Sequence, residues 1–284
     1  MLVNMGTLLS EAVKGGYAVG AFNFSTLESG LAAIEAAEET GCPFILQHAP
    51  AHEKYVPLDM AAPIMLQLAK AAKVPVAVHL DHGTDFALCR HALDLGFSSV
   101  MIDSSALPFE DNVAVVAAVV AEARRYGADV EAELGSMPHN FNGELGDYAP
   151  EDFYTRPDEA ALYVARTRVD ALAISFGTVH GVYKAKPSLS LEVVERVREA
   201  TNGLPLVMHG GSGLSDQDYQ DVISCGIRKI NYYTYGAIAG GRAVVALAKE
   251  RGDGLQFHDV AVAATKAMRA DVSRVMRLFS MKGV

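Results

Sequence analysis

The sequence predicts a (β/α)8 TIM barrel that forms one domain over residues 1–284 and carries an additional C-terminal helix. Apolar runs of strand length alternate with segments of helical period along the whole chain. The runs are apolar on both faces, which is typical of parallel strands covered by helices. About eight such units in a chain of this length match the eight-fold barrel, and no linker-like segment divides them.

The predicted elements follow one another in a regular order. The strands, in chain order, are Tyr17–Phe24, Pro43–His48, Pro75–His82, Ser98–Ser104, Asp129–Leu134, Ala171–Thr178, Pro205–His209 and Lys229–Thr234. Amphipathic helices between them include Leu27–Thr40, Met60–Ala72, Asp85–Leu95, Asn112–Tyr126, Leu191–Ala200, Asp216–Ser224 and Ala237–Arg251. The segment His258–Gly283 predicts the additional helix. The long connection Gly135–Pro157 is typical of a lid or an active-site wall.

A doubly wound open sheet is the competing fold. That fold favours a Gly-x-Gly-x-x-Gly turn after its first strand. The segment Gly20–Ser25 does not contain this pattern, so the closed barrel is the better prediction.

Composition limits the classes of function. The net charge of -10, without a lysine- or arginine-rich stripe, argues against nucleic-acid binding. The most apolar stretch, Val113–Ala123, is too short to span a bilayer, and the N-terminal residues lack a signal-peptide pattern. The cysteines Cys42, Cys89 and Cys225 are far apart and do not form a Cys-x-x-Cys motif. We therefore expect a soluble protein in a reducing, cytoplasmic environment.

Three histidines, His82, His180 and His209, each close an apolar run that we interpret as a barrel strand. The carboxyl ends of barrel strands meet at one face, where such enzymes build their active sites. Three neutral imidazoles leave a fourth position open on a tetrahedral zinc ion, as catalysis requires. A lone histidine in an apolar run is more often a hydrogen-bonded core residue, but the coincidence of three favours a metal site.

Carboxylates accompany these histidines. Asp81 precedes His82, and on a regular strand its side chain would face the opposite way; a turn of the backbone at the strand end would bring both to the pocket. Asp103 and Glu133 also lie near strand ends. Such groups carry protons, orient a histidine ligand or hold a metal ion. Each alone is equally compatible with a salt bridge or a helix cap.

A glycine-rich stretch, His209–Gly213, follows the seventh predicted strand and precedes a helix. Backbone N–H groups in such a turn can approach an anion, and the N-terminus of the helix favours negative charge. Asn231 and Thr234 follow the next strand and supply polar groups beside it. Loops after the seventh and eighth strands commonly bind phosphate in this fold, although glycines also serve ordinary tight turns.

With these residues in view, the chain resembles the class II, metal-dependent ketose-bisphosphate aldolases over nearly its whole length. The motifs that carry the resemblance are Ala21–Asn23, His79–His82, Ser99–Asp103, Glu131–Gly135, Gly177–Lys184, His209–Leu214 and Lys229–Asn231. The resemblance implies reversible cleavage of a ketose 1-phosphate or 1,6-bisphosphate, fructose- or tagatose-bisphosphate-like, into dihydroxyacetone phosphate and an aldehyde. It also implies a homodimer or homotetramer.

The resemblance further implies a role for each site residue. His82, His180 and His209 would hold a catalytic Zn²⁺, and Asp81 would carry the proton at the aldehyde-derived oxygen. Asp103 and Glu133 would hold a second or displaced divalent ion, and a monovalent cation would lie near the phosphate. The residues implied to bind dihydroxyacetone phosphate are Gly181, Gly210, Gly211, Ser212, Asn231 and Thr234, with Asn23 and Lys184 as further substrate contacts.

The chain departs from the family pattern at three places. The loop after Gly135 lacks the usual Gly-Gly-x-Glu-Asp acid, for which Glu144 is one candidate replacement. Ala49 stands where a serine or threonine is usual, and Tyr232 and Tyr233 stand where small residues are usual.

Two other functions fit parts of the sequence. The altered loop is compatible with a non-catalytic phosphosugar-binding subunit that retains the metal site. A barrel metallohydrolase that uses zinc-bound hydroxide is a third interpretation, but it gives no reason for the phosphate-binding stretch.

Overall fold

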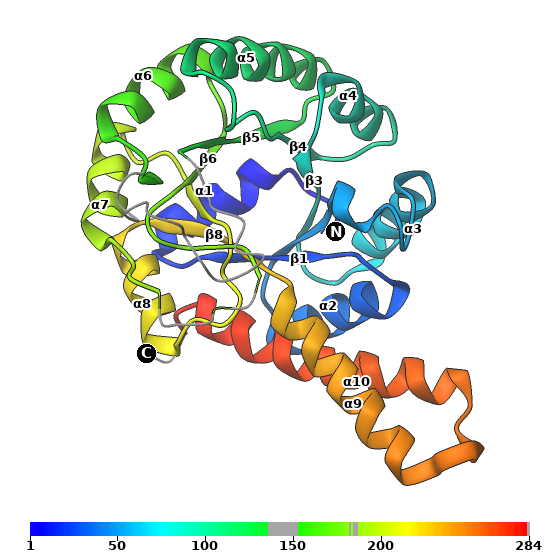
Figure 1. The fold of residues 1–284 in the computed structure, drawn as a ribbon. Coiled ribbons are helices and arrows are strands. Elements are labelled where there is room, and N and C mark those ends of the chain that lie inside the picture. Colours follow the sequence, from blue (N-terminus) through cyan, green and yellow to red (C-terminus); the bar gives the residue numbers. More distant parts are fainter. Residues whose placement is uncertain (136–152, 182, 184–186, 283–284) are drawn as a thin grey trace.

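The computed structural model describes residues 1–135, 153–181, 183 and 187–282, and within them eight parallel strands close into a barrel (Figure 1). Each strand pairs with the next along the chain, and β8 closes the barrel against β1. The strands are β1 (Val19–Asn23), β2 (Phe44–His48), β3 (Val76–Gly83), β4 (Ser99–Ile102), β5 (Asp129–Leu134), β6 (Ala171–Ile174), β7 (Leu206–Met208) and β8 (Ile227–Tyr232). The predicted fold class is confirmed.

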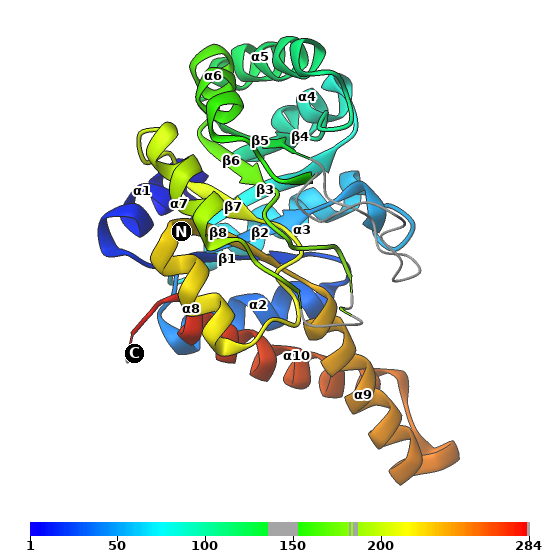
Figure 2. The ribbon, with the colours of Figure 1, turned by 60° about the vertical axis from the view of Figure 1, so that its left-hand side comes forward.

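Helices surround the barrel, as Figure 2 shows. They are α2 (Leu27–Thr40), α3 (Leu58–Ala71), α4 (Phe86–Asp94), α5 (Phe109–Arg125), α6 (Pro157–Thr167), α7 (Leu191–Ala200) and α8 (Asp216–Cys225), with the single-turn helix η1 (Pro50–His52) after β2. Local signals fix their ends: Thr26 and Ser215 form capping boxes that start α2 and α8, and Gly41 in a left-handed conformation ends α2. The helix α6 was not among the predicted helices.

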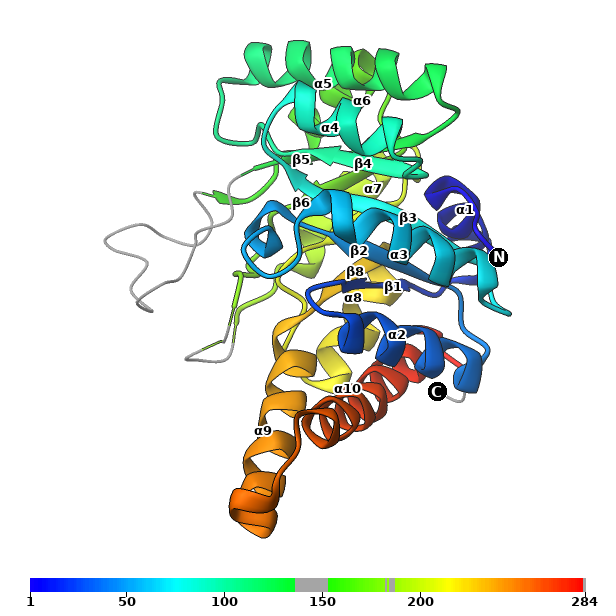
Figure 3. The ribbon, with the colours of Figure 1, turned by 90° about the vertical axis from the view of Figure 1, so that its right-hand side faces the viewer.

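An N-terminal helix, α1 (Met5–Gly15), closes one end of the barrel, and it too was not predicted from the sequence. In Figure 3 it lies at the end opposite the one from which α9 (Thr234–Arg251) leaves β8. Its buried face packs against small side chains that point into the barrel; the cluster includes Met5, Leu8, Leu9, Ala12, Ala21, Ala77, Ala173 and Val207. This apolar layer closes the end of the barrel that α1 covers.

A polar layer lies next to the apolar one, closer to the carboxyl ends of the strands. Side chains alternate between the two faces of a strand, so the residues two positions beyond Ile45, Ala77 and the other small residues also point inward. Gln47 and His79 are two of these residues, and Glu131 and Lys229 lie in the same layer, because Glu131 contacts both His79 and Lys229; all four are polar and completely buried. Because buried polar groups need partners, these side chains pair with one another or with polar groups beside them: Glu131 with Lys229, His79 with Ser99, and Gln47 with Asp81.

The C-terminal part of the chain forms a helical arm. The helices α9 and α10 (Phe257–Phe279), joined by η3 (Gly252–Gly254), pack on each other, and their tip extends away from the barrel (Figure 1). The base of α10 is anchored: Phe279 packs on Tyr232 and Tyr219, and Tyr232 Oη donates to Asp271 Oδ2 over 2.7 Å. The additional C-terminal helix is thus confirmed. Within the described ranges, no helix combines the length and apolar character needed to cross a membrane.

We expect Leu9→Ala to lower the free energy of unfolding by about 2–5 kcal/mol, because it leaves a cavity between α1 and the barrel. Leu9 is completely buried, whereas Val13 on the same helix is 39% exposed. The control Val13→Ala should shift stability by only about 0.5 kcal/mol. Urea unfolding followed by circular dichroism measures both, and equal effects would contradict the sealing role of α1.

Candidate active site

The end of β3 is irregular, and this irregularity positions both Asp81 and His82. The pairing of β3 with β4 shifts register between Leu80 and Gly83, and His82 has a left-handed backbone with φ of 50°. Such a conformation costs on the order of 1–3 kcal/mol for a residue other than glycine. The bulge lets two consecutive side chains face the barrel mouth, which a regular strand would not allow.

The structure brings His82, His180 and His209 together. The centre of the His82 ring lies 5.2 Å from that of His180 and 4.6 Å from that of His209. One ring nitrogen of each lies within 4.8 Å of the others, as ligands of a single ion would. His209 directly follows β7, but His180 lies six residues beyond the end of β6. Our expectation that His180 closes a strand was therefore wrong: a loop carries it to the site.

Hydrogen bonds determine which nitrogen of two of the rings is available to a metal. His82 Nδ1 lies 2.7 Å from Asp103 Oδ2, which leaves Nε2 toward the other histidines. His209 Nε2 lies 2.8 Å from Glu131 Oε1, which leaves its buried Nδ1, 3.1 Å from Glu133 Oε2, as the nitrogen available to a metal. Carboxylates that orient ligand histidines in this way are usual around metal ions. The residues present therefore fit a metal ion.

The electrostatics of the cluster favour positive charge. Burial by itself would lower the pKa of His209, but hydrogen bonds and charge interactions with Glu131 and Glu133 raise it to about 10. The pKa of Asp103 is held well below its usual range by His82, despite partial burial. A cation held at His209 Nδ1 would replace the proton that Glu133 otherwise stabilises there.

A second group of ligand atoms overlaps the first. His82, Asp103 and Glu133 also offer atoms within 4.8 Å of one another. Glu133 Oε2 lies 3.1 Å from His209 Nδ1, so it borders the same position. This arrangement can orient the histidines or hold an ion in a displaced position.

Asp81 is held by two amide donors. Asn231 Nδ2 donates to Asp81 Oδ1 over 3.0 Å, and Gln47 Nε2 donates to Asp81 Oδ2 over 2.9 Å. Burial alone would raise the pKa of Asp81, but the nearby charges of His82, Lys229 and His209 lower it to about 2. Asp81 is therefore an ionised carboxylate in the neutral pH range, able to accept a proton.

The loops after β7 and β8 form a backbone cradle beside the histidines. A Cβ atom on Gly210 would lie 2.3 Å from the carbonyl oxygen of Val179, so only glycine fits next to the His180 loop. Ser212 is buried, and its Oγ accepts hydrogen bonds of 3.0 Å from the backbone N–H groups of Tyr233 and Thr234. Ser212 thereby ties the β7 loop to the N-terminus of α9, an end of a helix that favours anions.

The remaining predicted site residues are distributed around this mouth. Asn23 ends β1, and its Oδ1 accepts from Gln47 Nε2 over 3.1 Å. Gly211 is bound to the backbone of Asn231, and Gly181 follows His180 with φ of 99°. Thr234 begins α9 instead of ending a strand. Lys184, Glu144 and most of the Gly135–Pro157 connection lie outside the described residues.

Sequence reasoning missed three buried residues that support the site: Gln47, Glu131 and Lys229. Each is a completely buried polar residue within a barrel strand. That pattern was the available signal, because charged side chains are almost never fully buried unless they are paired.

A parallel barrel with histidine and carboxylate ligands at the carboxyl ends of its strands is the architecture of metal-dependent barrel enzymes. Comparison with known proteins identifies the family. The model of the class II fructose-bisphosphate aldolases matches residues 3–284. A fructose-bisphosphate aldolase of Geobacillus stearothermophilus is 39% identical over 99% of this chain and 98% of its own length.

Two further relatives agree. A fructose-bisphosphate aldolase of Staphylococcus aureus is 41% identical over 86% of this chain and 85% of its own. The crystal structure of the YdjI aldolase from Escherichia coli K12 has a TM-score of 0.86 and 34% identity, and the match covers 100% of this chain and 99% of that one. The chain belongs to the class II fructose-bisphosphate aldolase family, and it is an aldolase, a carbon–carbon lyase.

We expect His180→Ala to remove bound zinc from the purified protein. Loss of a direct ligand should weaken zinc binding by more than the roughly 10–100-fold typical of losing a group that only orients a ligand. His91→Ala is the control, because His91 is exposed on α4 and pairs with Asp59. Elemental analysis after gel filtration measures both, and equal zinc content in the two variants would exclude His180 as a ligand.

Proposed function

We propose that this aldolase reversibly cleaves a ketose 1-phosphate or ketose 1,6-bisphosphate, fructose- or tagatose-bisphosphate-like, into dihydroxyacetone phosphate and an aldehyde. The observation that carries the proposal is the backbone contact between the two halves of the site. Gly210 of the cradle packs against Val179, the neighbour of His180. A phosphate in the cradle would therefore lie beside the histidine cluster, as a phosphorylated ketose requires.

His82, His180 and His209 would hold Zn²⁺, with Nε2 of His82 and Nδ1 of His209 as the ligand atoms. Bound zinc supplies a Lewis acid that stabilises the negative charge left beside the substrate carbonyl when the carbon–carbon bond breaks. Asp103 and Glu131 orient two of the imidazoles. Asp103 and Glu133 would also hold a second or displaced divalent ion, and a monovalent cation would lie near the phosphate.

Asp81 would act at the aldehyde end of the substrate. In cleavage its carboxylate removes the proton from the hydroxyl group that becomes the aldehyde oxygen, and the electron pair of the broken bond stays with the dihydroxyacetone phosphate half. In condensation it returns that proton as the new bond forms. The ionised state of Asp81 at neutral pH supports this role. No lysine Schiff base is needed, because zinc supplies the electron-withdrawing group.

The cradle would bind the phosphate of dihydroxyacetone phosphate. Its polar groups come from the two loops that Ser212 joins and from the His180 loop: Gly181, Gly210, Gly211, Ser212, Asn231 and Thr234. Asn23 and Lys184 are proposed as further contacts with the sugar. Neither the family nor the relatives favour the alternative of a non-catalytic phosphosugar-binding subunit.

We also propose a reducing, cytoplasmic environment for the protein. All three cysteines, Cys42, Cys89 and Cys225, are free and buried, which is usual where thiols remain reduced.

Metal removal tests the proposed reaction. We expect exhaustive dialysis against a chelator to reduce cleavage of the best substrate by roughly 100-fold or more, because the Lewis acid contributes several kcal/mol. Addition of Zn²⁺ should restore it, and a mock-dialysed sample is the control. The substrate panel contains fructose and tagatose 1,6-bisphosphates and several ketose 1-phosphates. Full activity in a sample proven metal-free would overturn the mechanism, and hydrolysis products without dihydroxyacetone phosphate would favour a hydrolase.

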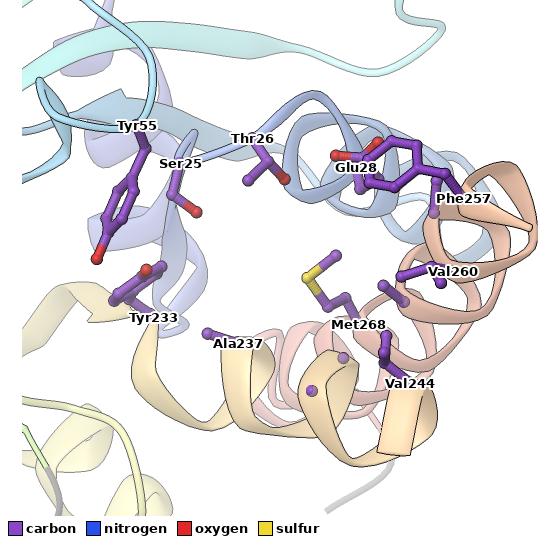
Figure 4. A pocket seen from close by; sticks show the side chains of 14 residues that line it. Ser25, Thr26, Glu28, Tyr55, Tyr233, Ala237, Val244, Phe257, Val260 and Met268 are labelled. Atoms are coloured by element: carbon purple, nitrogen blue, oxygen red, sulfur yellow. The ribbon is translucent and has the colours of Figure 1, made fainter. Parts of the chain in front are cut away.

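A second copy of this chain is the proposed partner of the helical arm. A groove of about 310 Å³ lies between α2, α9 and α10, and Figure 4 shows Met268, Val244 and Val260 along it and Tyr55 and Tyr233 at one end. Apolar side chains on the same arm are exposed: Val245 by 55%, Phe257 by 84% and Val262 by 67%. The groove borders the arm that carries these side chains, so two copies related by a two-fold axis can cover each other.

We expect Phe257→Ser combined with Val262→Ser to shift a dimer or tetramer toward the monomer, because the changes remove the most exposed apolar surface of the arm. Leu162→Ser is the control, since Leu162 is half-exposed on α6, across the barrel from the arm (Figure 1). Light scattering coupled to gel filtration measures the mass. An oligomer that survives the double substitution would place the contact elsewhere.

A further inference from the structure

Lys229 is a completely buried lysine on β8 to which the proposed reaction assigns no role. Its Nζ lies 2.8 Å from Glu131 Oε2 and donates to Asn231 Oδ1 over 2.7 Å. Burying an ammonium group is costly unless it is paired and hydrogen-bonded. The ion pair with Glu131 offsets that cost. The contact with Asn231 places the ammonium charge of Lys229 next to a residue of the proposed substrate site.

The ammonium group determines the orientation of the Asn231 amide. A lysine ammonium only donates hydrogen bonds, so it must face the oxygen of the amide. The amide nitrogen is thereby turned to Asp81, and Asn231 Nδ2 donates to Asp81 Oδ1 over 3.0 Å. The flipped amide would face the ammonium with its NH₂ group and the carboxylate with its oxygen, and both contacts would be repulsive.

Gln47 holds the other oxygen of Asp81. The Asp81 carboxylate therefore has two fixed amide donors, one on each oxygen, and each oxygen keeps a lone pair for another partner. Glu131, which pairs with Lys229, also accepts from His209 Nε2 over 2.8 Å. The buried carboxylate of Glu131 thus holds two groups in place: Lys229, which supports Asp81 through Asn231, and His209 of the proposed metal site.

We propose that Lys229 is a positioning residue for the aldehyde-side proton transfer: through the amide of Asn231 it holds Asp81 in its reactive geometry. This inference rests on the proposed function of Asp81. The inference predicts different effects on two steps of the reaction, proton exchange and carbon–carbon bond cleavage. Exchange of a carbon-bound proton of dihydroxyacetone phosphate with solvent takes place without the aldehyde, so it does not need Asp81. Cleavage and condensation do need it.

The test compares these two steps in the zinc-loaded enzyme. We expect Lys229→Met to lower kcat for cleavage about 100-fold, the loss typical of a displaced catalytic group, with KM changed by less than about threefold. Exchange of deuterium from D₂O into dihydroxyacetone phosphate, followed by NMR, should stay within about threefold of wild type. Zinc content by elemental analysis should be unchanged.

Lys229→Gln is the matched variant. Glutamine has no charge but can still donate a hydrogen bond to Asn231 Oδ1, so it should retain clearly more cleavage activity than Lys229→Met. If the ion pair with Glu131 were the only contribution of Lys229, the two neutral variants would be equally impaired. Equal impairment, or a parallel loss of cleavage, exchange and zinc, would overturn the positioning role.

Asp81→Asn separates failure of this inference from failure of the proposed function. It should lose cleavage and keep proton exchange. If Asp81→Asn cleaves normally, the role of Asp81 falls and the role of Lys229 falls with it. If Asp81→Asn loses cleavage while Lys229→Met keeps the wild-type kcat, only the role of Lys229 falls. Lys229→Gln provides the same comparison if Lys229→Met does not fold.

Discussion

The carboxylate of Glu131, at the centre of the barrel, is the group on which the site depends. It is completely buried, and Lys229, His209 and His79 surround it at 2.8, 2.8 and 3.6 Å. Lys229 lies on β8, His79 lies on β3 and His209 directly follows β7, so one charge on β5 fixes the relative positions of four strands. Removing one member of a buried ion pair typically costs about 3–5 kcal/mol, since the other charge stays buried. The orientation of His209 therefore rests on Glu131, and the support of Asp81 rests on Lys229 through Asn231.

The two ends of the barrel have opposite physical character, and both are needed. Below the polar layer, α1 and the small inward side chains exclude water from the Glu131 network. In such surroundings electrostatic interactions are stronger than in water, so Lys229 and Glu131 can orient the amide and imidazole above them. At the upper end, the bulge of β3 and the left-handed backbone of His82 turn the supported groups toward the mouth.

The sequence predicted the strands and the convergence of His82 and His209 because both depend on local pattern and on the rule that strand ends meet. It did not predict the support. Asn231 lies 150 residues from Asp81, and His209 lies 78 residues from Glu131; these contacts depend on the register of the whole barrel. The helix α1 was missed because it precedes the first strand and so lies outside the alternation of strands and helices that predicted the other elements. The position of His180 depends on a loop whose path no periodicity describes.

The residues that depart from the family pattern have two kinds of position in the structure: one anchors a helix, and others lie near the mouth of the barrel, where they can affect substrate specificity. Tyr232 packs on Phe22 and Phe279 and donates a hydrogen bond to Asp271, so it anchors α10. Tyr233 instead lies at the rim, with its ring 4.8 Å from that of His52. Ala49 lies on the same side, between β2 and η1. The residues proposed for the chemistry come mainly from strands and strand ends, whereas Ala49 and Tyr233 lie in the loops around the mouth. Variation there can change the aldehyde half of the substrate while the Glu131 network and the groups above it stay the same.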